Sequence, residues 1–121
     1  MGLDMYASTT TETLETEVDF KPEEANELHY WRKHPDLHGW MEELYYSKGG
    51  ASDCFNCVTV TLTLEDLDRL ENAIRNQDLP ETSGFFFGQS CDEDRAGDLE
   101  FIAKARLAIG DGKTVFYDSW W

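Results

Sequence analysis

The chain has 121 residues, of which 40% are hydrophobic and 13% aromatic, so residues 1–121 are predicted to form one globular domain with a ring-rich core. Its formal net charge of −15 at pH 7 argues against direct binding to nucleic acid or to an anionic membrane, since both need a cationic surface. The charge fits a well-solvated protein, a binder of basic protein surfaces, or a mimic of the nucleic-acid backbone.

The chain start lacks the basic region and apolar run of a signal peptide, and no apolar run approaches the ~20 residues of a membrane span. The odd number of cysteines then favours a reduced, cytoplasmic protein. Cys54 and Cys57 have the spacing of a zinc or redox pair, but only Cys91 and the histidines remain to complete a zinc site. We therefore expect ordinary thiols and neither a metal nor another cofactor.

Two segments near the start alternate apolar and polar residues, which is typical of half-buried strands. These segments are residues 3–8 and 14–20, and they are expected to form an antiparallel hairpin. In the second segment one face is apolar and the other is wholly acidic. That acidic face is either simply solvated or a partner-binding surface, and its carboxylates belong to Glu15, Glu17 and Asp19.

Two helices are predicted next. Pro22 followed by two glutamates is typical of a first helical turn and predicts a helix over 22–34, which Pro35 would end. Asp36 is expected to cap a second helix over 37–47, since apolar residues recur there every three or four positions.

The second half alternates strands and helices. A β-branched run predicts a strand over 57–63, and Thr63 with Asp66 forms a variant capping box for the next helix. An aromatic strand over 83–88, a helix over 98–109 and a last strand over 114–121 follow. The order favours an α+β fold, a small and mainly antiparallel sheet with three to four helices packed against it.

One block differs from the acidic remainder. Residues 29–50 carry three positive and three negative side chains, and they include all three histidines and two of the four tryptophans. Rings beside cations suit a planar, anionic ligand such as a nucleotide, although the same side chains could pack in a core and neutralise a helix end. On the first interpretation, an aromatic and basic pocket would be lined by Tyr30, Trp31, Arg32, Lys33, His34, His38, Trp40, Phe85, Phe86, Phe87 and Trp120.

No catalytic set is apparent. His34 and His38 are four residues apart, but Pro35 interrupts the helical register and the glutamate of a zinc-protease motif is missing. No serine lies in a nucleophile-elbow context, and no nucleophile, base and orienting group can be named together. We therefore expect a protein that is not an enzyme.

Four blocks together resemble a family of small uncharacterised proteins of tailed bacteriophages and prophages. They are the opening Gly2–Leu3–Asp4–Met5–Tyr6, the Tyr30–Trp31–Arg32–Lys33–His34 block with His38 and Trp40, Ser83–Gly84–Phe85–Phe86–Phe87–Gly88, and the closing Tyr117–Asp118–Ser119–Trp120. The family's opening usually continues with leucine, where this chain has Ala7. The resemblance implies a viral protein of the host cytoplasm, brings no known activity, and makes the aromatic blocks plausible neighbours around one pocket.

The leading hypothesis is a non-enzymatic phage accessory protein that docks on a host protein through an acidic surface, with nucleic-acid mimicry as one form. That surface would comprise Glu15, Glu17, Asp19, Asp92, Glu93 and Asp94. The alternative is a small-molecule or nucleotide-sequestering protein that uses the aromatic and basic pocket. Exposed rings at Trp120 or Trp121 would in addition favour a homo-oligomer.

Overall fold

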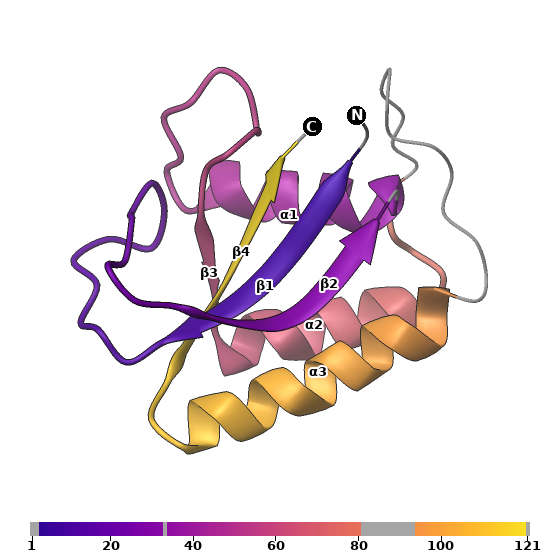
Figure 1. Cartoon of the computed structure of the whole chain (residues 1–121). Helices are drawn as coiled ribbons and strands as arrows, with labels where there is room; N and C mark the ends of the chain where they lie inside the picture. Colours follow the sequence, from indigo (N-terminus) through magenta and orange to yellow (C-terminus); the bar gives the residue numbers. More distant parts are fainter. Residues whose placement is uncertain (1–2, 33, 81–93, 121) are drawn as a thin grey trace.

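The computed structural model describes residues 3–32, 34–80 and 94–120, whose elements follow the order ββαβααβ (Figure 1). This is the α+β fold expected from the sequence, with a four-stranded antiparallel sheet and three helices in the described part of the chain. The elements are β1 (Asp4–Thr10), β2 (Asn26–Arg32), α1 (Pro35–Ser47), β3 (Val60–Leu62), α2 (Leu64–Arg75), α3 (Asp94–Gly110) and β4 (Thr114–Trp120).

The sheet has the strand order β2-β1-β4-β3, which places the first and last strands side by side at its centre. β1 and β4 pair along their whole length, from Asp4 opposite Trp120 to Thr10 opposite Thr114. β1 also pairs with β2, and that register shifts between Ala7 and Ser8. The two ends of the described chain therefore meet at one end of the sheet.

All three helices pack against one face of the sheet (Figure 1). Strand residues alternate between the two faces, so every second side chain of β1, β2 and β4 enters this core. The sheet contributes Met5, Ala7, Trp31, Val115 and Tyr117, and the helices contribute Leu37, Met41, Tyr45, Leu67, Leu70, Phe101, Ile102 and Ala105.

The prediction of a strand over 14–20 is wrong, and so is its hairpin with residues 3–8. In the structure this stretch is irregular, and its strand-type pairing with the sheet is one isolated bridge between Val18 and Val60. Asp19 has a positive φ of 55°, which breaks the extended conformation. The partner that β1 takes is β2, farther along the chain.

The prediction of a helix over 22–34 is also wrong, because residues 26–32 form β2. Residues 22–24 do form a hydrogen-bonded structure, but this structure does not start a helix. The backbone N–H groups of Glu23 and Glu24 are satisfied by the carboxylate of Glu12, at 3.1 and 2.6 Å, instead of starting a helix. Pairing with β1 then extends the following residues.

The other elements agree with the sequence except at their ends. α1 begins at Pro35 with His34 at the N-cap, so the expected cap at Asp36 is wrong. The capping box of α2 is confirmed, since Thr63 Oγ1 accepts from the N–H of Asp66 at 3.2 Å. The Asp66 carboxylate in turn accepts from the N–H of Thr63 at 3.0 Å. α3 begins before the predicted residue 98. The predicted strand over 83–88 lies outside the described residues.

Candidate functional site

An open groove of about 840 Å³ runs between the connection from β1 to β2 and the start of α2. One wall is residues 11–17, and the opposite wall is formed by residues 61–65 with the turn between α3 and β4. Four carboxylates line it, against one ammonium group. They belong to Glu12, Glu15, Glu17 and Glu65, and the ammonium to Lys113.

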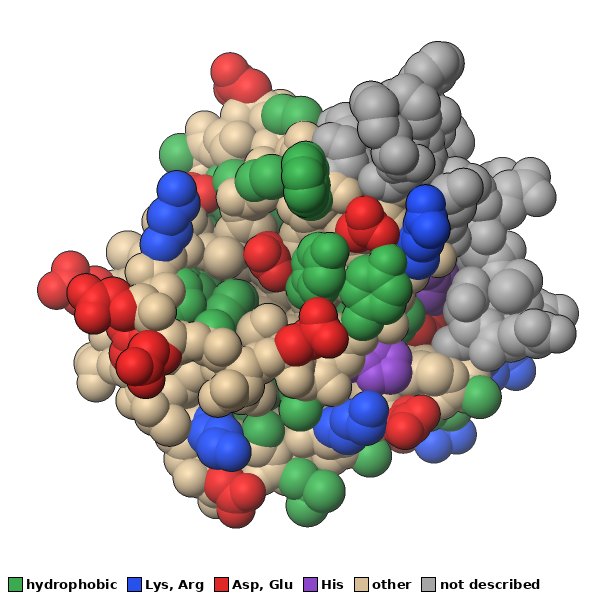
Figure 2. Space-filling model, viewed as in Figure 1, with side chains coloured by type: hydrophobic (Ala, Val, Ile, Leu, Met, Phe, Trp, Pro, Cys, Tyr) green, Lys and Arg blue, Asp and Glu red, His purple; other side chains and the backbone are tan. Residues whose placement is uncertain are grey.

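The first wall belongs to a longer acidic segment, which we define as residues 11–25. It contains six carboxylates and a single lysine, Lys21. Figure 2 shows acidic side chains gathered at the left of the molecule, where Figure 1 places this connection. Among the described residues, the one ion pair of the segment joins Glu17 to Lys48 at 3.8 Å. The segment is therefore a face of largely uncompensated negative charge.

Hydrogen bonds hold the acidic segment in shape. The Glu12 carboxylate accepts from Glu24 and Glu23, and these bonds lower the pKa of Glu12. Asp19 accepts from the hydroxyl of Tyr45 at 2.5 Å and from the N–H of Ala51 at 3.1 Å. Asp19, predicted as part of the partner-binding surface, thus also anchors the segment to α1 and the loop after it.

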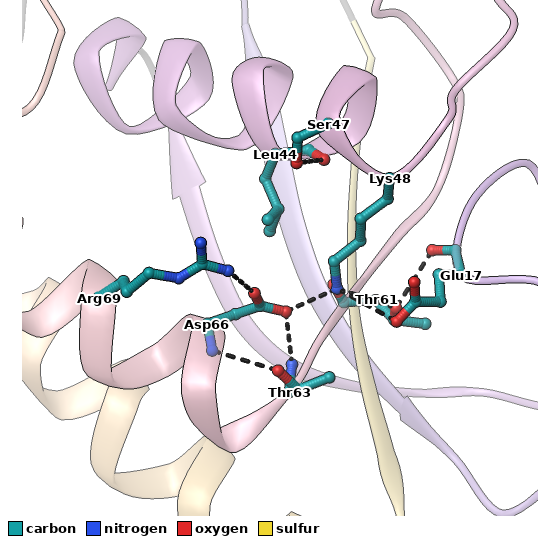
Figure 3. A network of polar contacts seen from close by, with 8 residues as sticks. All are labelled: Glu17, Leu44, Ser47, Lys48, Thr61, Thr63, Asp66 and Arg69. Carbon is teal, nitrogen blue, oxygen red and sulfur yellow. Dashed lines mark hydrogen bonds and ion pairs between the residues drawn. The ribbon is translucent and has the colours of Figure 1, made fainter.

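A polar network ties the groove to the helices (Figure 3). Lys48, just after α1, donates from Nζ to Asp66 Oδ2 at 2.6 Å and to the carbonyl oxygen of Thr61 at 2.8 Å. On the far side, Arg69 donates to the other carboxylate oxygen of Asp66 at 2.5 Å. The backbone of Thr61 in turn bonds to the carbonyl oxygen of Glu17 at 2.8 Å. The network therefore fixes Thr61, in one wall of the groove, relative to α1 and α2.

Asp66 is the centre of this network. Burial alone would raise its pKa, but hydrogen bonds from Lys48 and Thr63 and the charge of Lys48 outweigh burial, so its pKa is lowered. The side chains of Asp66 and Lys48 are only 3% and 10% exposed. A buried pair of this kind supports the groove structurally and is closed to a ligand.

The block predicted to form an aromatic and basic pocket is divided between the two faces of the sheet. Trp31 points into the core, where its ring lies edge-on to Phe101 with centroids 4.8 Å apart. Tyr30 and Arg32 lie on the opposite face, as strand alternation requires. Trp120 shares that open face, since it pairs with Asp4, which also pairs with Arg32. Trp31 and Trp120 thus do not line one pocket.

The predicted ligand histidines are buried parts of the core. His34 Nε2 lies 2.8 Å from Asp98 Oδ2, and the indole N–H of Trp31 donates to the other oxygen of that carboxylate at 3.0 Å. Asp98 was not foreseen, although it lies on the same helical stripe as Phe101, Ile102 and Ala105. An aspartate on an apolar stripe is the signal that could have found it.

His38 is fully buried beside Tyr117, whose hydroxyl lies 2.7 Å from its Nδ1. Burial lowers the pKa of His38 to about 4, so the ring is neutral at pH 7. Burial also raises the pKa of Tyr117, which stays a neutral phenol. The pair is a neutral hydrogen bond within the core.

The remaining predicted site residues are dispersed. Trp40 is half-buried and lines a separate hollow of about 210 Å³ with Arg69. Cys54 and Cys57 are exposed free thiols, and no cluster of three metal-ligating side chains occurs in the described ranges. Asp94 begins α3. Six further predicted residues lie outside the described residues, namely Lys33, Phe85, Phe86, Phe87, Asp92 and Glu93.

Within residues 3–32, 34–80 and 94–120, no helix is long and apolar enough to cross a membrane. Searches with the chain against family models, curated proteins and solved structures found no match.

Proposed function

We propose that this chain is a non-enzymatic binding protein whose acidic segment and groove dock on a basic surface of a partner protein. In line with the resemblance to phage proteins, the partner proposed is a host protein. The observation that carries the proposal is the contrast between paired and unpaired charge. Glu12, Glu15 and Glu17 line an open groove, and among the described residues the segment forms one weak ion pair. By contrast, Arg75 of α2 and Arg106 of α3 form ion pairs with neighbouring carboxylates.

The concentrated negative charge of residues 11–25 destabilises the folded chain unless a cationic partner balances it. Like charges held close together repel, and a cationic partner would relieve that repulsion while gaining attraction of its own. The acidic segment is fixed in shape by the bonds of Glu12, Asp19 and the Thr61 backbone, so little ordering is needed on binding. Preorganised negative charge beside a groove favours a protruding basic element of the partner.

The proposal is tested by affinity capture from bacterial lysate with the tagged full chain. At about 0.05 M salt the chain is expected to retain one protein in near-equal amount, and at about 0.5 M salt to lose it, because salt screens exposed charge pairs. Mass spectrometry identifies the retained protein. A partner retained equally at both salt concentrations would contradict docking through exposed carboxylates.

A further inference from the structure

The face of the sheet opposite the helices carries a second, chemically different surface. Its side chains alternate with the core residues of β1, β2 and β4, and no described helix covers them (Figure 1). Figure 2 looks onto this face and shows hydrophobic side chains with acidic ones among them over the strands. Tyr30 and Trp120, at 45% and 66% exposed, are among the most exposed large hydrophobic residues described.

Strand register arranges this surface in rows. One row places Tyr6 between Tyr30 and Asp118, and the next places Asp4 between Arg32 and Trp120. The rings of Tyr6 and Tyr30 have centroids 5.3 Å apart, and the hydroxyl of Tyr30 donates to Asp4 Oδ1 at 2.6 Å. The ring pair is thereby held in place beside a carboxylate.

Three carboxylates surround the ring of Tyr6. Its pKa is raised first by burial and then by the charges of Asp4, Glu27 and Asp118. In the described part of the chain, the positive charge paired with one of these carboxylates is that of Arg32, whose Nε is 3.8 Å from Asp4 Oδ1. Asp118 has no cation within ion-pair distance among the described residues, and burial raises its pKa. The rows therefore offer the half-buried carboxylate of Asp118 beside two tyrosine rings that are tilted by 49° to each other.

We propose that this open sheet face binds an arginine side chain of a protein partner. A guanidinium can lie against a tyrosine face while its N–H groups donate to a carboxylate, so one group satisfies both features of the surface. Lysine fits less well, because its ammonium is compact and more strongly hydrated. Phosphate is disfavoured by the three carboxylates, which excludes nucleic acid as the occupant.

This inference rests on the proposed function in one respect, since both need a cationic protein partner, but it uses another surface. The groove and the open face lie on different parts of the sheet. The groove is lined by the last residues before β4 and the first of β4, whereas Asp118 and Trp120 are near the end of that strand. Separate variants can therefore test the two surfaces separately.

The test is an NMR titration of the isotope-labelled full chain with a short peptide that alternates arginine and glycine. Matched peptides replace arginine by lysine or by citrulline, which keeps the shape without the charge. We expect the arginine peptide to shift signals of Asp4, Tyr6, Tyr30, Asp118 and the Trp120 indole. The lysine peptide is expected to bind several-fold more weakly, and the citrulline peptide not at all.

Two variants assign the site. Asp118→Asn is expected to weaken arginine-peptide binding about fivefold, and Tyr6→Leu by a similar factor, because each removes one feature of the surface. Asp111→Asn, which removes an exposed carboxylate after α3, is the matched control and is expected to leave the affinity unchanged. If Tyr6→Leu fails to fold, Asp118→Asn still decides the question.

Four results would overturn the inference. They are shifts confined to residues 11–25, equal affinity for the lysine peptide, Asp118→Asn indistinguishable from Asp111→Asn, and shifts of the same signals on dilution without peptide, which would mean that a second copy covers the face. Glu15→Gln with Glu17→Gln is expected to leave the peptide shifts intact. A failure of the groove proposal alone would then be recognised by partner capture that survives Glu15→Gln with Glu17→Gln while arginine-peptide binding is preserved.

Discussion

The acidic segment and the surface shared by α2 and α3 differ in how far their charged side chains form ion pairs. On the helices, Arg106 bonds to Glu71 at 2.5 Å and to Asp68 at 2.7 Å, and Arg75 bonds to Glu71 at 2.8 Å. In residues 11–25, six carboxylates share one ion pair with the described part of the chain, at 3.8 Å. Net charge alone therefore does not distinguish these two regions, whereas the local balance of charge does.

Lys48 pairs with Glu17 of the acidic segment and with Asp66 of α2. Breaking the Lys48–Asp66 pair is expected to have the largest effect on stability. Lys48→Met leaves the buried carboxylate of Asp66 without its ammonium, and we expect the free energy of unfolding to fall by about 4 kcal/mol. Urea denaturation measures it. The control is Lys104→Met, which breaks a surface pair with Glu100 and is expected to cost less than ~0.5 kcal/mol. Equal losses in the two variants would show that Asp66 does not depend on Lys48.

The buried His38 provides a prediction about pH. Its pKa is about 4 in the folded chain and 6.5 ordinarily, so the unfolded chain takes up a proton first as the pH falls. Stability is therefore unaffected above pH 6.5 and decreases from there toward pH 4, by about 3 kcal/mol from this group.

Denaturation curves of the parent and of His38→Asn across that range separate this group from others. The variant is expected to start less stable, because the bond to Tyr117 is disturbed, but to lose less stability on acidification. His29 contributes a change of the same sign, since burial and Lys104 lower its pKa, and it is present in both proteins. Parallel curves for the two proteins would refute the assignment to His38.

Thr63 tests the groove wall with a smaller effect. Thr63→Ala removes the cap of α2 and is expected to lower the free energy of unfolding by about 1 kcal/mol, since one N–H at the helix start loses its partner. Thr63→Ser keeps the hydroxyl and should stay close to the parent. A serine variant as unstable as the alanine variant would show that the methyl group, and not the cap, matters.

Hydrogen bonds between residues close in the sequence could be predicted from it, whereas contacts between distant segments could not. The capping box of Thr63 and Asp66 spans three residues, so the chain itself specifies it. The glutamates after Pro22 were misassigned because Glu12, eleven and twelve residues away, satisfies their N–H groups. The β1–β2 pairing then decides that Tyr30 and Trp31 face opposite sides of the sheet.

For the candidate site too, local properties could be predicted from the sequence and long-range contacts could not. Exposure of Glu15 and Glu17 could be anticipated because charged side chains are rarely buried, although the strand predicted around them did not form. The burial of His34 could not, because it depends on Asp98, 64 residues farther along the chain. The groove itself exists because residues 11–17 lie beside residues 61–65, which no local pattern predicts.

Within the acidic segment, Glu12 and Asp19 hold the fold, whereas the proposed function assigns Glu15 and Glu17 to binding and not to folding. The most direct test combines Glu15→Gln and Glu17→Gln and measures both stability and partner capture at low salt. We expect the free energy of unfolding to stay within ~0.5 kcal/mol of the parent, since both residues are exposed, while capture is lost. The matched control, Asp53→Asn with Asp111→Asn, removes the same charge elsewhere and should retain the partner. Capture that survives in the first variant, or is lost equally in the control, would contradict docking through the acidic segment.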